Sequence, residues 1–314
     1  MTALTHHCCV IGGSGFIGHH LVEILGRQGK TLTVIGRNHL PSRTLPAGVR
    51  YIAGDYGDRT FLRSVLHDVD EIIDLAYASV PKTSFEDPVN DILSNLPSSV
   101  NLFEVASSFP IKKIVIVSSG GTIYGKALRL PIREDHPTNP ISPYGITKLA
   151  VEKYALMYHA LKGLPVVCVR PGNAFGEGQI PFKGQGFVAT AIASALKGQE
   201  INIFGEQGTI RDFVYVKDLA RGIAVALDHC PSGGCYNIGS GQGRSNKEII
   251  EMVAAIAKSR NIALRVKVLP SRQYDVPANV LDSSKLRKET GWFPAIPLKE
   301  GLELTWKHFE QHYN

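Results

Sequence analysis

No apolar run in this sequence approaches the roughly 18 residues that a membrane-spanning helix needs, so we expect no bilayer-spanning segment. Its 5 cysteines form no CxxC pair, and three lie inside apolar, strand-like runs, which is typical of reduced core residues. The first residues show no basic region followed by a long apolar core, so we expect no secretory signal. Together these absences favour a cytoplasmic location.

Charge of one sign is not concentrated anywhere, although the net charge is +6. There is no Lys/Arg block and no ribbon of basic and aromatic residues, so we expect no nucleic-acid partner and no membrane partner. The histidines also lack metal-ligand spacing, which predicts no metal site. An anionic small molecule suits the modest excess of positive charge.

Short apolar runs alternate with helical patterns through the first half of the 314 residues. Ile17, Leu21, Ile24 and Leu25 recur at helical spacing, and Gly29 follows as a stop signal. The alternation predicts an α/β fold with a Rossmann-type, doubly wound parallel sheet. The runs expected to be buried strands are 8–11, 32–35, 49–52, 72–75, 114–117 and 166–169.

The texture changes near residue 171, where glycine and proline become dense and regular alternation stops. We therefore predict a dinucleotide-binding domain over 1–171, to which a segment of about 213–240 returns. A smaller C-terminal α/β region over 172–314 would mainly bind substrate. No Pro- or Ser-rich linker separates the two, so they should share one cleft.

A glycine-rich loop lies directly between the first predicted strand and the first predicted helix. Gly12, Gly15 and Gly18 form a GxxGxxG pattern, which lets the backbone turn tightly and approach a pyrophosphate. The free N–H groups of the helix N-terminus would then bind that anion. At this position the pattern predicts dinucleotide binding.

The end of the second strand carries no carboxylate to hold the ribose 2′-hydroxyl of NAD. Arg37 stands there instead, and an arginine accommodates the 2′-phosphate of NADP or is simply a solvated surface residue. Asp55 follows the third strand, where it could accept a hydrogen bond from adenine or cap the next helix. The residues therefore leave NAD and NADP open.

Tyr144 and Lys148 form a YxxxK pair one helical turn apart. A free tyrosine, with a pKa near 10, is a poor base at neutral pH. A nearby cation favours the phenolate and brings that pKa toward the working range. The order of glycine loop, Ser118 and Ser119 at a strand end, and YxxxK opening a helix makes the pattern specific.

With these motifs the chain resembles the extended short-chain dehydrogenase/reductase superfamily. Within it, the resemblance is to the nucleotide-sugar epimerase/dehydratase family, closest to UDP-glucose 4-epimerases, and it runs essentially end to end. The further motifs that carry it are SSGGTIYG at 118–125, NPISPYG at 139–145, RPGNAFG at 170–176, RDFVYVKD at 211–218 and YNIGSG at 236–241.

The resemblance implies a role for each matching residue. Tyr144 would be the acid/base at the sugar 4-hydroxyl, and Lys148 would hold the nicotinamide ribose. Asn173 and Arg211 would hold the nucleotide diphosphate, with Arg272 and Asp275 as a second clamp, although a surface ion pair is the alternative for either arginine. The implied cofactor contacts are Tyr144 and Lys148 together with Gly12, Gly15, Phe16, Ile17, Gly18, Arg37, Asp55, Tyr56, Leu75, Ala76, Asn95 and Ser118.

One departure from the family pattern concerns the third catalytic residue. Many 4-epimerases carry Ser or Thr four residues before the tyrosine that corresponds to Tyr124 of the Tyr124-Gly125 pair. Here that position is Gly120. Thr122, which matches a family threonine, and Ser119 are the candidates to bond the 4-oxygen instead.

Three functions follow from the resemblance. The favoured one is an NAD-dependent 4-epimerase of UDP-glucose and UDP-galactose; the alternatives are an NADPH-dependent 4-keto-sugar reductase, which Arg37 favours, and a non-catalytic cofactor-binding sensor. A dehydratase is disfavoured because Gly120 is not followed by the Asp-Glu pair of that branch.

Substrate range and assembly are also implied by the resemblance. Asn279 stands where the family shapes the pocket at sugar C2, and its small size predicts that UDP-N-acetylhexosamines are tolerated. Alternatively, Asn279 points into the core or bonds its own backbone. A homodimer is expected through the helix after Tyr144 and the helix near 88–108, whose apolar residues could equally face the sheet.

Overall fold

The computed structural model describes residues 6–272 and 276–312, and its larger part is a fully parallel seven-stranded sheet. Each predicted strand overlaps one of the first six strands, which confirms the doubly wound α/β prediction. The strand order is β10-β6-β5-β4-β1-β2-β3. The strands are β1 (His7–Ile11), β2 (Thr31–Gly36), β3 (Arg50–Ala53), β4 (Glu71–Asp74), β5 (Lys113–Val117), β6 (Val166–Pro171) and β10 (Cys235–Ile238).

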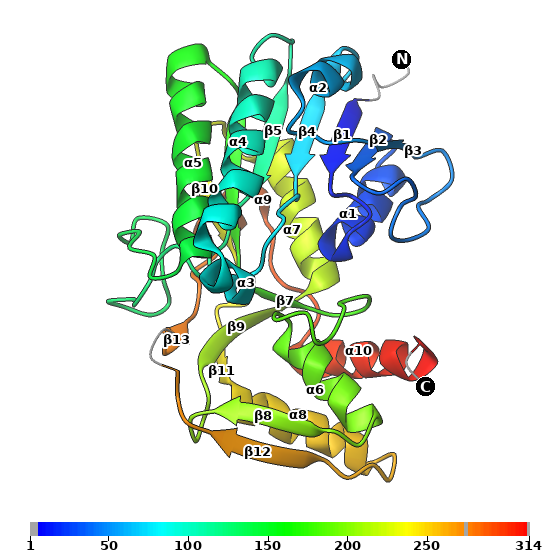
Figure 1. Cartoon of the computed structure of the whole chain (residues 1–314), viewed down its shortest axis with the longest axis vertical. Helices are drawn as coiled ribbons and strands as arrows, with labels where there is room; N and C mark the ends of the chain where they lie inside the picture. The colour runs from blue at the N-terminus through cyan, green and yellow to red at the C-terminus, as the bar shows by residue number, and fades with distance from the viewer. Residues whose placement is uncertain (1–5, 273–275, 313–314) are drawn as a thin grey trace.

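Helices cover both faces of this sheet, as the upper part of Figure 1 shows. Cys8 and Val10 pack into the core on one face, and Cys9 and Ile11 pack into the core on the other. Burial on both faces explains why the strands are continuously apolar. The helices are α1 (Phe16–Arg27) and α7 (Val216–His229) on the first face, and α2 (Arg59–Leu66), α4 (Pro88–Ala106) and α5 (Pro143–Lys162) on the second.

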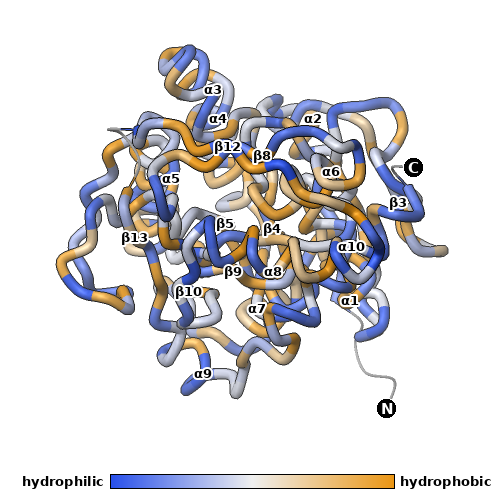
Figure 2. Tube along the Cα trace, turned by 90° about the horizontal axis from the view of Figure 1, so that it is seen from below, coloured by the Kyte–Doolittle hydropathy of each residue, from blue (hydrophilic) through white to orange (hydrophobic). Residues whose placement is uncertain are grey.

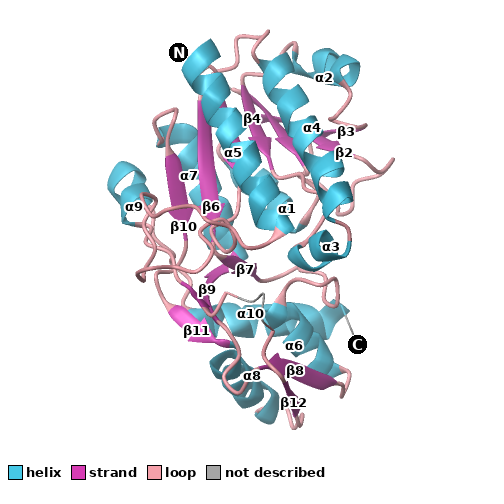
Figure 3. Cartoon of the chain, turned by 60° about the vertical axis from the view of Figure 1, so that its left-hand side comes forward, coloured by secondary structure: helices cyan, strands magenta, loops and turns pink. Residues whose placement is uncertain are grey.

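A second, smaller part lies below the sheet (Figure 3). Its core gathers around Trp306 and Phe309. Its strands are β7 (Asn173–Phe175), β8 (Glu200–Phe204), β9 (Ile210–Tyr215), β11 (Gly243–Ser245), β12 (Arg265–Leu269) and β13 (Ala278–Asn279). Its helices are α6 (Phe187–Leu196), α8 (Asn246–Lys258) and α10 (Leu298–His312); two short helices, α3 (Pro81–Glu86) and α9 (Ser284–Thr290), pack against the sheet part.

The chain crosses between the two parts more than once. After β9 it returns to the sheet as α7 and as β10, which pairs with β6. We propose a boundary at residue 171, with 213–240 returning to the first domain.

Within the described ranges, no helix combines the length and apolarity that crossing a membrane requires.

Seen from below, hydrophobic segments run through the middle of the molecule and α3 lies at its edge (Figure 2).

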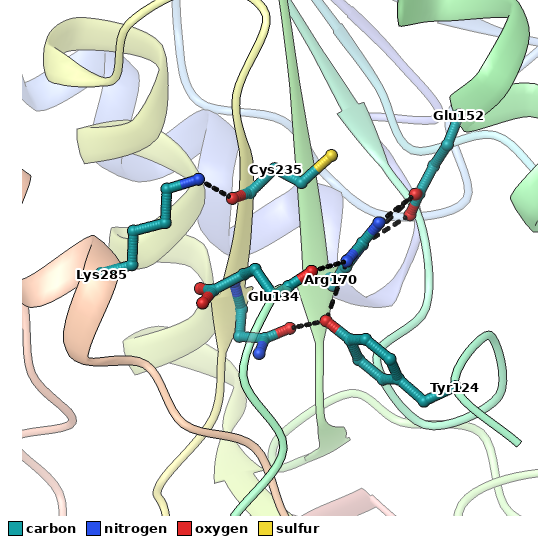
Figure 4. Close-up of polar contacts among 7 residues, drawn as sticks. Tyr124, Glu134, Glu152, Arg170, Cys235 and Lys285 are labelled. Carbon is teal, nitrogen blue, oxygen red and sulfur yellow. Dashed lines mark hydrogen bonds and ion pairs between the residues drawn. The ribbon is translucent and has the colours of Figure 1, made fainter. Parts of the chain in front are cut away.

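A buried ion pair ties α5 to the sheet (Figure 4). The guanidinium of Arg170 on β6 donates to both carboxylate oxygens of Glu152 on α5, with the shortest bond at 2.7 Å. Arg170 also donates to the hydroxyl of Tyr124 at 2.9 Å, and that hydroxyl donates to Asn237 at 2.7 Å. The network therefore fixes α5, which begins with the YxxxK pair, against two neighbouring strands.

Candidate active site

A cavity of about 490 Å³ lies where the strand order reverses, at the carboxyl ends of β1, β2 and β4. This topological switch point is where open α/β sheets bind their ligands. Eight of the predicted cofactor contacts line the cavity: Gly12, Gly15, Arg37, Asp55, Tyr56, Leu75, Ala76 and Asn95.

The glycines of the loop are required by its geometry. Gly12 has φ +78°, a conformation that side chains disfavour. A Cβ on Gly18 would lie 2.5 Å from the carbonyl oxygen of Gly12, so the first turn of α1 can pack this closely only with glycine. Gly15 precedes α1 without a capping side chain, which leaves the first N–H groups available to a phosphate. The loop thus fits a dinucleotide.

The other predicted cofactor contacts are not part of the lining of this cavity. Phe16, Ile17 and Gly18 form the first turn of α1. The hydroxyl of Ser118 is buried and has no hydrogen-bond partner within the described protein, so it can bond a ligand group.

Arg37 and Asp55 are both exposed at the rim of this cavity. The carboxylate of Asp55 accepts a hydrogen bond from the backbone of Gly57 at 2.8 Å. The next helix is capped by Asp58, whose carboxylate accepts from two backbone N–H groups. Asp55 is therefore not the helix cap, and its side chain stands at the cavity.

A second cavity, of about 460 Å³, lies between the sheet part and the smaller part. Residues from both parts line it, as the absence of a linker predicts. The predicted site residues among them are Ser119, Thr122, Tyr144, Asn173, Arg211 and Arg272; Asp275 lies outside the described residues.

Tyr144 and Lys148 stand in the first turns of α5, which is capped by the hydroxyl of Ser142. The Nζ atom of Lys148 donates to the carbonyl of Val117 at 2.8 Å and lies 5.9 Å from the ring centroid of Tyr144. Burial raises the pKa of Tyr144 above its ordinary range, so its phenolate needs a compensating positive charge. Lys148, whose Nζ atom lies near the Tyr144 ring, can supply such a charge.

The electrostatics of Lys148 are set by opposing effects. Burial lowers the pKa of its ammonium to about 8, while Asp74, Glu152 and Asp91 act in the other direction. Burial also raises the pKa of Asp74 to about 6, and Lys148 partly offsets that shift. The proton on Lys148 is therefore lost far more easily than that of an exposed lysine.

Glycine at position 120 has a steric cause. A Cβ there would lie 2.6 Å from a methyl carbon of Leu281 and 2.8 Å from the carbonyl oxygen of Arg170. A serine at this position would collide with both. Thr122 lines the second cavity, and its buried hydroxyl has no partner among the described residues, so this hydroxyl is a candidate to bond a substrate oxygen.

Asn279 does not line the second cavity. It is 1 % exposed, and its amide donates to the carbonyl of Gly120 at 2.9 Å. Its side-chain oxygen has no partner within the described ranges. The side-chain amide of Asn279 therefore bonds the backbone of the protein, not a ligand. Asn279 could affect the sugar only indirectly, by positioning the backbone at residue 120.

Sequence reasoning missed Tyr77, Ser79 and Asp91. Tyr77 follows the predicted fourth strand by two residues, so its place near the cofactor cavity was readable from the pattern, whereas its contact with Tyr144 was not. Asp91 is 1 % exposed on α4, and nothing in the local sequence marks it as a buried acid.

Comparison with known proteins adds four findings. The model of the NAD dependent epimerase/dehydratase family matches residues 8–239. A putative UDP-glucose 4-epimerase of Methanocaldococcus jannaschii is 32% identical over 94% of this chain and 95% of its own length. Among solved structures, the UDP-glucose 4-epimerase of Thermotoga maritima with UDP-glucose has a TM-score of 0.91 at 30% identity, covering 98% of this chain and 100% of that one. The Thermus thermophilus UDP-glucose 4-epimerase complex with NAD has a TM-score of 0.89 at 34% identity, covering 98% and 99%.

Proposed function

Because this chain belongs to the NAD dependent epimerase/dehydratase family, we propose that it is a 4-epimerase of UDP-glucose and UDP-galactose. It is an NAD-dependent epimerase of the extended short-chain dehydrogenase/reductase type. The observation that carries the proposal is the position of Tyr144, which lines the second cavity while its helical neighbour Lys148 is buried beside it.

In this proposal NAD is held by the glycine loop, and when bound it supplies the acceptor that takes hydride from C4 and returns it to the opposite face. Tyr144, which lines the cavity that would hold the sugar, takes the proton of the 4-hydroxyl as a phenolate and gives it back. Lys148 keeps a positive charge close to that phenol. Thr122, or alternatively Ser119, bonds the 4-oxygen and fixes its direction.

The same cavity can hold the nucleotide diphosphate. Arg211 and Arg272 line one side of it, and a guanidinium is permanently charged and matches phosphate geometry. Arg211 is itself held by donation to the carbonyl of Val276 at 2.7 Å, so its position is restrained. Asn173 adds an amide that can bond a diphosphate oxygen or a sugar hydroxyl.

A second candidate is an NADPH-dependent 4-keto-sugar reductase, favoured only by Arg37 at the rim of the cofactor cavity. The two candidates differ in how they treat the cofactor. An epimerase regenerates it in each turnover and should retain it, whereas a reductase exchanges it. Denaturing the freshly purified protein and identifying the released nucleotide tests this: NAD is expected, and empty protein that consumes NADPH with a keto-sugar nucleotide would favour the reductase.

We also propose a homodimer through α4 and α5. On α5, Val151, Ala155 and Tyr158 face the core, whereas Tyr154 is 39% exposed. Further exposed apolar side chains on the two helices are Val89, Ile92, Leu93, Ile146, Met157 and Leu161. Sedimentation at micromolar protein should give the dimer mass, and a monomer would refute the assembly. The free thiols suit a cytoplasmic location, which stays a proposal.

A further inference from the structure

Tyr77 lies between the two cavities and touches both members of the YxxxK pair. It lines the cofactor cavity, and its ring meets the ring of Tyr144 edge to face, with centroids 4.9 Å apart at 68°. The Nζ atom of Lys148 lies over the face of Tyr77, 4.0 Å from the centroid. That is closer than its 5.9 Å separation from the ring of Tyr144.

The loop that carries Tyr77 is tethered on both sides. The backbone N–H before Tyr77 donates to Asp74 at 3.0 Å, and the one after it donates to Asn95 at 2.7 Å. The hydroxyl of Ser79 donates to the buried carboxylate of Asp91 on α4. These contacts leave the Tyr77 ring little freedom to turn away from Lys148.

Lys148 is 6 % exposed, so its charge cannot be stabilised by bulk water. The acidic groups that act on it come from three elements: Asp74 on β4, Asp91 on α4 and Glu152 on α5. Glu152 is already bonded to Arg170 and Asp91 to Ser79, so neither forms a direct ion pair with Lys148. Asp74 accepts a hydrogen bond from the backbone N–H of Ala76. The described residues also place the aromatic face of Tyr77 4.0 Å from the Lys148 ammonium, and such contacts are strongest where water is excluded.

We propose that Tyr77 is a positioning residue that holds Lys148 charged and in place beneath Tyr144 through a cation–π contact. The inference rests on the proposed function, because it assigns Tyr77 to the same proton-transfer machinery. Tyr77 itself transfers no proton. It keeps the positive charge that the phenolate of Tyr144 requires.

The contact has a measurable consequence with a definite sign. Without the aromatic face, the ammonium form of Lys148 is less favoured, so its pKa falls. The basic limb of the kcat–pH profile, where Lys148 loses its proton, then moves to lower pH. The expected shift is about 1.5 pH units, the size that a desolvated cation–π contact corresponds to. KM for the sugar nucleotide should change little.

Two substitutions separate the aromatic face from the hydroxyl. Tyr77→Phe keeps the ring and is expected to leave the pKa of Lys148 unchanged, whereas Tyr77→Leu removes the ring and should lower it. The pKa is read directly by NMR titration of ¹³C-labelled lysine side chains in the cofactor-loaded protein, with Lys148→Met identifying the signal. Equal Lys148 pKa values in the Phe and Leu variants would overturn the proposal.

A third variant covers the case in which Tyr77→Leu fails to fold. Pentafluorophenylalanine at position 77 keeps the shape of Phe but reverses the electrostatics of the ring face. It should lower the pKa of Lys148 relative to Tyr77→Phe, and an unchanged value would count against the contact. Because the NMR titration needs no turnover, wild-type protein that fails to epimerise would refute the proposed function without deciding the role of Tyr77.

Discussion

Glu152→Gln removes one charge from the buried pair that holds α5 against β6. The side chains of Glu152 and Arg170 are 1% and 6% exposed, and three donor–acceptor contacts of 2.7–3.2 Å join them. A neutral amide keeps the shape but leaves the guanidinium buried without a counter-charge. The contacts of Arg170 with the Tyr124 hydroxyl and the Glu134 carbonyl, at 2.9 and 3.3 Å, cannot replace it.

The magnitude follows from that loss. Removing one partner of a buried ion pair costs about 3–5 kcal/mol, because the remaining charge has lost its solvation and its partner. Replacing both partners by apolar groups of similar size is often neutral or stabilising. We therefore expect Glu152→Gln to lower the free energy of unfolding by about 3–5 kcal/mol, and Glu152→Leu combined with Arg170→Met to cost far less.

Chemical denaturation followed by tryptophan fluorescence and far-UV circular dichroism measures both variants under the same conditions. Trp292 and Trp306 lie in the cores of the two different parts, so they report on both. A loss below about 1 kcal/mol for Glu152→Gln, the range of an exposed pair, would refute the reasoning. So would a double variant as unstable as the sum of the two single ones.

Three further predictions concern the chemistry. Tyr144→Phe should reduce kcat by about 10²–10⁴-fold with the fold and bound cofactor retained, and activity within a few-fold of wild type would remove Tyr144 from its role. Thr122→Val should lower kcat more than Ser119→Ala, because the Thr122 hydroxyl is buried without a partner in the described protein; the reverse order would assign the 4-oxygen contact to Ser119. Asn279→Tyr removes the amide that bonds the Gly120 carbonyl, between the cavity residues Ser119 and Gly121, so any effect on the sugar is indirect. It should lower the ratio of kcat/KM for UDP-N-acetylhexosamines over UDP-hexoses by no more than the range of about 1–3 kcal/mol typical of an added substituent, and an unchanged ratio means that Asn279 is not the selector.

Local sequence patterns predicted those features that depend on a single segment of the chain. Buried parallel strands are apolar on both faces, the glycine loop needs its residues for the turn at Gly12 and the packing at Gly18, and YxxxK lies on one helix. These features led to the fold, the cofactor cavity and Tyr144.

Long-range packing decided what the sequence did not reveal. The steric need for Gly120 comes from Leu281, which lies far along the chain and is brought close only by the fold. The position of Asn279 depends on the same contact region, since its amide reaches the Gly120 carbonyl. Tyr77 meets Tyr144 only because β4 ends and α5 begins at the same edge of the sheet. No local periodicity encodes such contacts.

The most direct test of the account follows the hydrogen at C4. Purified protein with no added cofactor is incubated with UDP-glucose deuterated at C4, and the UDP-galactose formed is analysed by NMR and mass spectrometry. Transient hydride transfer within one active site predicts product that retains deuterium at C4. Loss of the label to solvent, or no interconversion in the presence of bound NAD, would contradict the account.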